Sequence, residues 1–405
     1  MNRQKILLIM LGLVAAPLGA EQSDSVAEQA SEPTPVSFDS PSYKRRPYQV
    51  TVGIRQEYDD NINTTEFDPQ SSFKTIVEPE IALNIPDSRT FLGLRYRNST
   101  VYYWDRAGED FDFGHFFDLS FNHEFTQRFS VDLTENFRFS QEPEITENNS
   151  IFRRQGDFIQ NSAEAGASYY LTRRLFLSVR AGHNFWDYDD PFLSVDLDRQ
   201  VFTTGGGVNF LVSPLTLLSA NYDYVLTEYE TSPRDSDSHM AYLGVLHTFT
   251  PQWSARAQAG AEYRKAESFK GEYAPFAAVS TSYQFLPGSS VTAGYNTSLQ
   301  DTDASIYNFS ESHRGYISLT SQLSYDLKLE TGADFVLSEY SSNQQLFGLP
   351  TDAEETTLVY RITLLYRITP QMFADLGYSF TTVESDFIGR SYDRNLVSAG
   401  IKYVY

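Results

Sequence analysis

Residues that could carry out chemistry are sparse in this 405-residue chain. There are six histidines and no cysteine, which excludes disulfides and thiolate zinc sites. No pair of histidines has the HExxH spacing of zinc hydrolases, and no Gly-x-Ser-x-Gly turn presents a nucleophile. We therefore expect no enzyme, no resident metal and no cofactor. A Ser, His and Asp set gathered from distant segments is the one catalytic arrangement left open.

Two acidic clusters, Glu109 to Asp112 and Asp187 to Asp190, have the carboxylate oxygens that Ca²⁺ prefers. Neither has the spacing of a defined calcium loop. We expect them to be solvated loop charge, or to bridge through divalent cations to lipopolysaccharide phosphates.

Charged side chains also recur at every second position, between apolar ones. Such residues would share the polar face of a strand and could line a lumen. On this face the two signs nearly balance, which predicts weak ion selectivity and disfavours a dedicated conduit for polyanions. Pairing across strands, simply to solvate the interior, is the alternative role. The candidate lumen-lining residues are Arg95, Arg97, Arg138, Arg180, Arg256, Glu262, Arg361, Arg367 and Asp375.

The segments that carry these residues alternate with period two. From Trp253 to Tyr263 every second residue is apolar, while Arg256 and Glu262 belong to the interleaved polar set. The same alternation runs from Leu358 to Ile368 and from Val291 to Leu299, where Val291, Thr297 and Leu299 belong to the set expected to face lipid. Segments of ten to fifteen residues with this pattern are typical of tilted spanning strands, although a soluble sandwich shows it too.

The rhythm of the connections favours a barrel. Very tight turns alternate with long acidic loops, as in spanning barrels. We therefore predict an all-β fold, a transmembrane antiparallel up-and-down barrel of about 18 strands (16 to 18), with both termini on the tight-turn side. The predicted tight turns lie at Asp87-Ser88, Thr126-Arg128, Thr172-Arg174, Val212-Pro214, Thr250-Gln252, Leu286-Gly288, Asp326-Leu327 and Thr369-Gln371.

Composition agrees with this fold. Aromatic residues make up 15% of the chain, yet the mean hydropathy is -0.38, as expected when a greasy outer belt alternates with a polar lumen. The net charge of -22 excludes nucleic acid as a partner. Trp253 is expected to anchor at a membrane interface. The aromatics predicted to form the interfacial girdles are Tyr102, Tyr103, Trp104, Phe185, Trp186, Tyr188, Tyr222 and Tyr224.

The first 47 residues differ from the rest. Residues 1–20 have the pattern of a secretory signal peptide, with Arg3 and Lys5 before an apolar run too short to span a bilayer. Residues 21–47 are polar and rich in proline, which predicts a disordered periplasmic segment. The barrel is expected to cover residues 48–405. The strand that ends at Tyr405 is expected to engage the outer-membrane assembly machinery.

The run Glu57-Tyr58-Asp59-Asp60-Asn61-Ile62, followed by Glu78-Pro79-Glu80-Ile81 and Leu94-Arg95-Tyr96, resembles the opening of the putative β-barrel porin-2 family. This resemblance implies a location in the outer membrane and an association with exopolysaccharide loci, and it supplies no catalytic residue.

Together these features predict a multi-pass barrel of the cell outer membrane, with its long loops extracellular and both termini periplasmic. The leading function is a porin-like pore, for exopolysaccharide export or for passage of small polar solutes. The alternative is a plugged barrel that acts as a structural anchor or binding protein through its acidic loops. Expected partners are outer-membrane lipid, lipopolysaccharide and a polysaccharide.

Overall fold

The computed structural model describes residues 47–141, 144–147, 150–153, 156–266, 271–302, 307, 309–341 and 352–405. The expected signal peptide and the segment 21–47, apart from Pro47, lie outside these residues. Within them, no helix combines the length and apolarity needed to cross a membrane.

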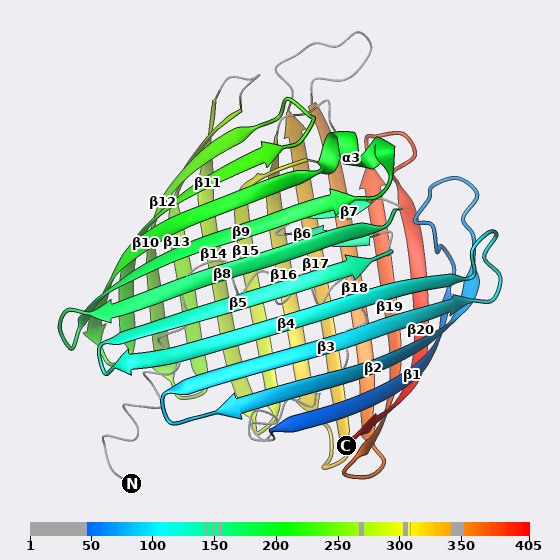
Figure 1. Cartoon of the computed structure of the whole chain (residues 1–405), viewed down its shortest axis with the longest axis horizontal. Helices are drawn as coiled ribbons and strands as arrows, with labels where there is room; N and C mark the ends of the chain where they lie inside the picture. The colour runs from blue at the N-terminus through cyan, green and yellow to red at the C-terminus, as the bar shows by residue number, and fades with distance from the viewer. Residues whose placement is uncertain are drawn as a thin grey trace.

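Eighteen antiparallel strands form one sheet, and the first strand pairs with the last to close it into a barrel (Figure 1). The predicted fold class and strand number are therefore confirmed. The barrel strands are β1 (Tyr48–Asp59), β2 (Ser72–Pro86), β3 (Thr90–Tyr103), β4 (Phe111–Thr126), β5 (Phe129–Ser140), β8 (Phe158–Tyr170), β9 (Leu175–Tyr188), β10 (Arg199–Ser213), β11 (Thr216–Tyr229), β12 (Ser236–Thr250), β13 (Trp253–Ala266), β14 (Glu272–Leu286), β15 (Ser289–Gln300), β16 (Phe309–Gln322), β17 (Leu327–Ser341), β18 (Asp352–Arg367), β19 (Met372–Ser385) and β20 (Tyr392–Val404).

Alternation along each strand separates a lipid-facing surface from a lumen-facing one. In β1, Val52 and Ile54 are about half exposed on the outer face, whereas Arg55 and Asp59 are buried on the inner face. Because side chains of a strand point to opposite faces in turn, the sequence pattern fixes both surfaces at once.

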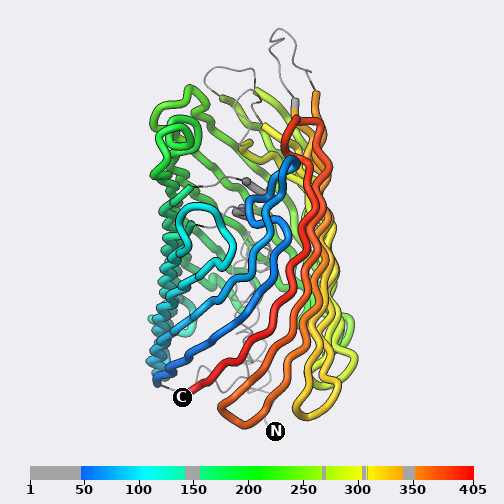
Figure 2. The backbone as a smooth tube through the Cα atoms, turned by 90° about the vertical axis from the view of Figure 1, so that its right-hand side faces the viewer, coloured from blue at the N-terminus to red at the C-terminus, as the bar shows by residue number. Residues whose placement is uncertain are grey.

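Tight turns of two to four residues join the strands at one end, at the eight predicted positions. Threonine hydroxyls stabilise several of them: Thr126 Oγ1 accepts the backbone N–H groups of Arg128 and Phe129, and Thr172 makes the same turn with Arg174 and Leu175. The start of β1 and the end of β20 lie at this same end (Figure 2).

Longer connections lie at the other end. The connection after β9 contains the short helix α3 (Pro191–Leu197). The connection after β5 contains a separate two-stranded hairpin of β6 (Glu144–Glu147) and β7 (Ser150–Arg153), which the sequence pattern did not predict. In both views this hairpin lies between opposite walls of the barrel (Figures 1 and 2).

Two levels of aromatic side chains ring the outer surface. At the long-loop end, the hydroxyls of Tyr96, Tyr222 and Tyr295 hydrogen bond to a histidine of the next strand. At the tight-turn end, Phe249 stacks on Trp253, whose indole N–H donates to Thr281. These levels fit interfacial girdles.

The spacing of histidines on the outer face gives the distance between the two aromatic levels. His115 and His123 in β4, and His239 and His247 in β12, are each eight residues apart on the outer face. At ~3.4 Å per residue and a tilt of ~40°, that spacing is about 20 Å along the membrane normal, near the height expected of an apolar band.

Part of the predicted girdle was wrong. Tyr103, Trp186 and Tyr188 are 3–7% exposed and lie on the inner face. The other predicted girdle residues, Tyr102, Trp104, Phe185, Tyr222 and Tyr224, share the outer face with these girdles. The three exceptions are covered from within by neighbouring side chains and, for Trp186 and Tyr188, by α3.

The end of β15 also departs from prediction. Thr297 and Leu299 are buried rather than exposed to lipid, and Leu299 packs with Phe309 against Ala266 and Ala274. The ladder between β14 and β15 stops at Ala277 and Thr297. Pro275, two residues further on, has no N–H to continue a ladder. The end of β15 and the start of β16 thus bend over the inner side of β13 and β14.

Candidate functional site

The lumen wall is the surface on which chemistry is possible, and it carries a dense set of charged side chains. Strand register places the nine candidate lining residues on this inner face. Ion pairs occupy Arg95, Arg97, Arg180, Glu262, Arg361 and Arg367. Arg138 lies over the rings of Phe116 and Phe158. Among the described residues, none forms an ion pair with Arg256 or Asp375.

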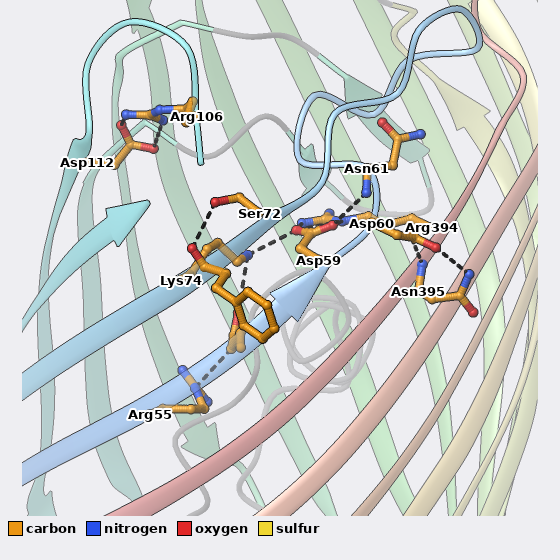
Figure 3. A network of polar contacts seen from close by, with 12 residues as sticks. Arg55, Asp59, Asp60, Asn61, Ser72, Lys74, Arg106, Asp112, Arg394 and Asn395 are labelled. Carbon is orange, nitrogen blue, oxygen red and sulfur yellow. Dashed lines mark hydrogen bonds and ion pairs between the residues drawn. The ribbon is translucent and has the colours of Figure 1, made fainter. Parts of the chain in front are cut away.

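A continuous ladder of alternating charges crosses the seam where β1 meets β20, and Figure 3 shows its part from Arg55 to Arg394. Each member contacts an opposite charge at 2.7–3.3 Å, so burial is compensated at every step. The order from β3 across β2 and β1 to β20 is Arg97, Glu78, Arg55, Glu57, Lys74, Asp59 and Arg394.

Asp59 is the most deeply buried carboxylate of this ladder, followed by Glu57. Its Oδ2 accepts from Lys74 Nζ at 3.0 Å and from Arg394 Nη2 at 2.7 Å, and it is 0% exposed. Next to it, Asp60 accepts from the backbone and side-chain N–H groups of Asn395. The side chain of Asn61 donates to the backbone oxygen of Asp393. Side chains from the two ends of the barrel sequence therefore hold the seam together.

A second ion pair spans a whole strand. Arg180 in β9 and Asp223 in β11 meet at 2.5 Å above Gly205, which pairs with both residues in the intervening strand β10. A Cβ atom at Gly205 would lie 1.9 Å from Asp223 Oδ1. Glycine is thus required at this position because the ion pair occupies the space of a side chain.

A third group lies on the opposite wall. Arg314 in β16 is 2% exposed and meets Asp334 of β17 at 2.5 Å, and Arg361 of β18 approaches the other oxygen of the same carboxylate at 3.5 Å. One buried acid thus links three neighbouring strands.

Arginine and aromatic side chains alternate along the wall from β3 to β10. The guanidinium carbon of Arg97 lies 4.1 Å from the centroid of Phe116, and Arg199 lies 5.4 Å from that of Trp186. Between them, Arg138 lies 5.6 Å from Phe116 and 5.5 Å from Phe158. Cations over ring faces are stabilised by the ring quadrupole. The sequence analysis missed this arrangement: it assigned Trp186 to the lipid interface and gave no role to Phe116 or Phe158.

The helix α3 covers the upper part of this wall. Asp190 caps it by accepting the N–H groups of Phe192 and Leu193, and Leu197 packs on Phe158, Trp186 and Tyr188. Other loop segments contact one another beside it: Arg234 donates to Thr302 at 2.6 Å and to the backbone oxygen of Asp196. Tyr307 packs on Tyr340 and Phe387.

Asp198 ends the helix at a point where charge is disfavoured. Burial raises the pKa of its carboxyl to about 6, with Asp187 and Glu230 adding to the effect, while the N–H of Tyr188 and the charge of Arg199 act against it. An acid whose pKa is higher in the folded state than in the unfolded state stabilises the folded state at low pH, where it is protonated. For Asp198 this contribution to the free energy of unfolding is lost as the pH rises through about 6.

Groupings that could hold a metal ion are not assembled among the described residues. No three of the His, Asp and Glu side chains there gather as metal ligands. All six histidines lie on the outer face, away from the lumen. In the acidic cluster 109–112, Asp112 is engaged by both terminal nitrogens of Arg106, at 2.7 and 2.8 Å.

The model of one protein family, described as putative beta-barrel porin 2, matches residues 49–405. The chain belongs to this family. It is a porin-like barrel of the outer membrane, in agreement with the family resemblance of the first hairpin. A search of curated proteins finds no match.

Several solved outer-membrane barrels are similar to this chain at low identity. A BenF-like porin from Pseudomonas fluorescens Pf-5 is 11% identical, with a TM-score of 0.47 and coverage of 88% of this chain and 99% of that one. The outer membrane protein opdK from Pseudomonas aeruginosa is 8% identical, with the same TM-score and coverages. The copper transporter OprC is 10% identical at a TM-score of 0.46. That match covers 85% of this chain and 64% of the transporter, so the chain spans less than two thirds of its length.

Neutralising Asp59 tests the seam. Asp59→Asn leaves Lys74 and Arg394 buried with less compensation, so we expect a loss of about 3–5 kcal/mol in the free energy of unfolding, measured by urea titration in lipid vesicles. Asp110→Asn, in an exposed loop position, is the matched control and should change it by less than about 0.5 kcal/mol. Equal stabilities of the two variants would show that the ladder does not hold the seam.

The need for glycine beneath the Arg180–Asp223 pair is tested by Gly205→Ala. The added methyl group must displace Asp223, and we expect about 1–3 kcal/mol of destabilisation in the same titration. Gly182→Ala on the neighbouring strand is the control, because its Cβ would make only ordinary contacts, at 3.6 and 3.7 Å. The explanation fails if the two alanine variants are equally stable.

The raised pKa of Asp198 predicts that α3 covers Trp186 more firmly at pH 5 than at pH 7.5. Acrylamide quenching of Trp186, in a Trp104→Phe, Trp253→Phe background, should increase as the pH rises through about 6. Asp198→Asn should remove this dependence. A pH-dependence that persists in the asparagine variant would assign it to another group.

Proposed function

We propose that the protein is a pore through which polar solutes cross the outer membrane. One observation carries this proposal: the inner wall of a closed barrel carries charged side chains on many of its strands, and most of these charges are held in ion pairs. A wall of this kind stays hydrated, and an 18-strand barrel is too wide for wall side chains alone to fill.

The balance of charge limits the class of solute. Basic and acidic side chains alternate within the ladder and around Asp334, so the wall creates no large field of one sign. Weak ion selectivity follows, with a cation preference only at the acidic loops. We propose neutral or zwitterionic solutes, among them an exopolysaccharide in export, and we infer that a strongly anionic polymer is disfavoured.

Orientation and partners form part of the same proposal. The long loops would be extracellular, with lipopolysaccharide phosphates bridged to loop carboxylates by divalent cations, and both termini would be periplasmic. The strand ending at Tyr405 would be recognised by the outer-membrane assembly machinery.

Single-channel recording tests the pore. Refolded barrel, checked for folding by its heat-dependent mobility in SDS gels, should give a large conductance with a cation-to-anion permeability ratio near one. Exopolysaccharide fragments added to one side should reduce the current. Correctly folded protein without conductance would contradict the proposal.

A plugged barrel that anchors or binds polymer through its loops is the second candidate. It is favoured by α3, which packs on lumen-facing aromatics, and by the contacts of Arg234 with Thr302 and Asp196. Replacing residues 190–198 with a glycine-serine linker distinguishes the two. If the segment acts as a plug, only the replaced protein conducts; if wild type and variant conduct alike, the plug is excluded.

A further inference from the structure

A pocket opens on the inner wall beside the seam, between β1, β2, β3, β18, β19 and β20. Six charged residues line it, three of each sign: Arg55, Arg97 and Lys402, with Glu78, Glu80 and Asp375. A pocket that is neutral overall but strongly charged locally does not favour a ligand of one net charge.

Four of these six charges are already used within the protein. Arg97 pairs with Glu78 at 3.3 Å, Arg55 pairs with Glu78 at 3.1 Å, and Glu80 pairs with Arg95 of the neighbouring strand. These contacts fix the side chains and leave little of their charge for a ligand.

Lys402 and Asp375 differ from the other four. In the part of the chain that the structure describes, neither one forms an ion pair within 4.0 Å, and they do not pair with each other; Arg55 and Glu80 are the opposite charges that act most strongly on Asp375 and Lys402, from a longer distance. They lie on adjacent strands at diagonal positions, since Lys402 pairs with Phe373 and Asp375 with Gly400. Diagonal positions of this kind are ~7–8 Å apart at their Cα atoms, close enough for one small molecule to reach both side chains.

Two glycines open the floor between these charges. Gly53 pairs directly with Lys402, and Gly400 pairs with Arg55 on one side and Asp375 on the other. The carboxylate of Asp375 leans over Gly400, where an added Cβ would lie 2.6 Å from its Oδ1. An added Cβ at Gly53 would meet nothing closer than 3.8 Å. A small side chain at Gly53 would thus fit against Glu78 without strain, and both Gly53 and Lys402 line the pocket.

We propose that this seam pocket binds a zwitterionic group, with a ligand carboxylate on Lys402 and a ligand ammonium on Asp375. The site rests on the proposed pore function for its role, since a ligand held there would lie on the solute path. Free amino acids and amino-sugar units next to uronic acids share this chemistry.

Binding to the folded barrel in detergent, followed by calorimetry, tests the site without requiring conductance. The probes are glycine, β-alanine and γ-aminobutyrate, which differ in charge separation, with acetate and ethylammonium as singly charged controls. At least one zwitterion should bind more tightly than both controls. Lys402→Met and Asp375→Asn should each weaken it by about tenfold or more, as expected for loss of a charged partner.

Two further variants distinguish loss of the binding site from loss of folding. Gly53→Leu should abolish binding by filling the floor, while its circular dichroism and heat-modifiable mobility stay those of wild type. Arg256→Gln, at an inner-face position on β13 outside the pocket, should bind like wild type. Undiminished binding in the Lys402→Met, Asp375→Asn double variant, or acetate binding as tightly as the zwitterions, would overturn the proposal.

Conductance separates this inference from the pore itself. If zwitterions bind and the barrel is silent in bilayers, the site stands and the pore fails; if the barrel conducts and no zwitterion binds, the reverse holds. Competition by a partly N-deacetylated hyaluronan tetrasaccharide would identify saccharide units as ligands. Its failure to compete, with γ-aminobutyrate bound, would assign the site to free amino acids.

Discussion

The pairing of β1 with β20 is the constraint on which the rest of this structure depends. In the apolar core of a membrane no water satisfies an open sheet edge, so a spanning sheet has to close on itself. Here nine residue pairs join the two strands, from Thr51 with Val404 to Asp59 with Leu396. The most deeply buried carboxylate of the wall, Asp59, lies at the upper limit of that pairing and binds a cation from each side of the seam.

Closure determines what the interior must contain. A ring of 18 strands exposes half of its side chains to an enclosed space, where charge is tolerated only in water or beside opposite charge. The Arg180–Asp223 pair, the Arg314–Asp334–Arg361 group and the seam ladder meet this requirement in three places. Glycine on the intervening strand is also required, because an ion pair that bridges over a strand occupies the space that a side chain of that strand would fill.

At the long-loop end of the barrel, apolar contacts accompany the ionic ones. There, apolar side chains gather: Leu197 of α3 on Trp186, and Tyr307 on Phe387. These contacts bring loop segments over a polar lumen and would narrow the entrance without filling the barrel below. A balanced wall under a partly covered entrance agrees with the proposed passage of neutral or zwitterionic solutes, and Lys402 and Asp375 would lie on that path.

The sequence alone predicted the barrel strands, the eight tight turns and the inner face of the nine lining residues, because period-two alternation and turn chemistry are local, but it did not predict the hairpin of β6 and β7. Local patterns do not encode which distant strands meet. The Asp59–Arg394 contact joins residues 335 positions apart, and no sequence pattern around either residue predicts this contact. Trp186 and Leu299 were placed toward lipid for the same reason: contacts with α3 and with the start of β16, and not the alternation, decide what covers them. Tertiary structure thus decided the partners and the buried contacts, since these depend on register and closure around the whole ring.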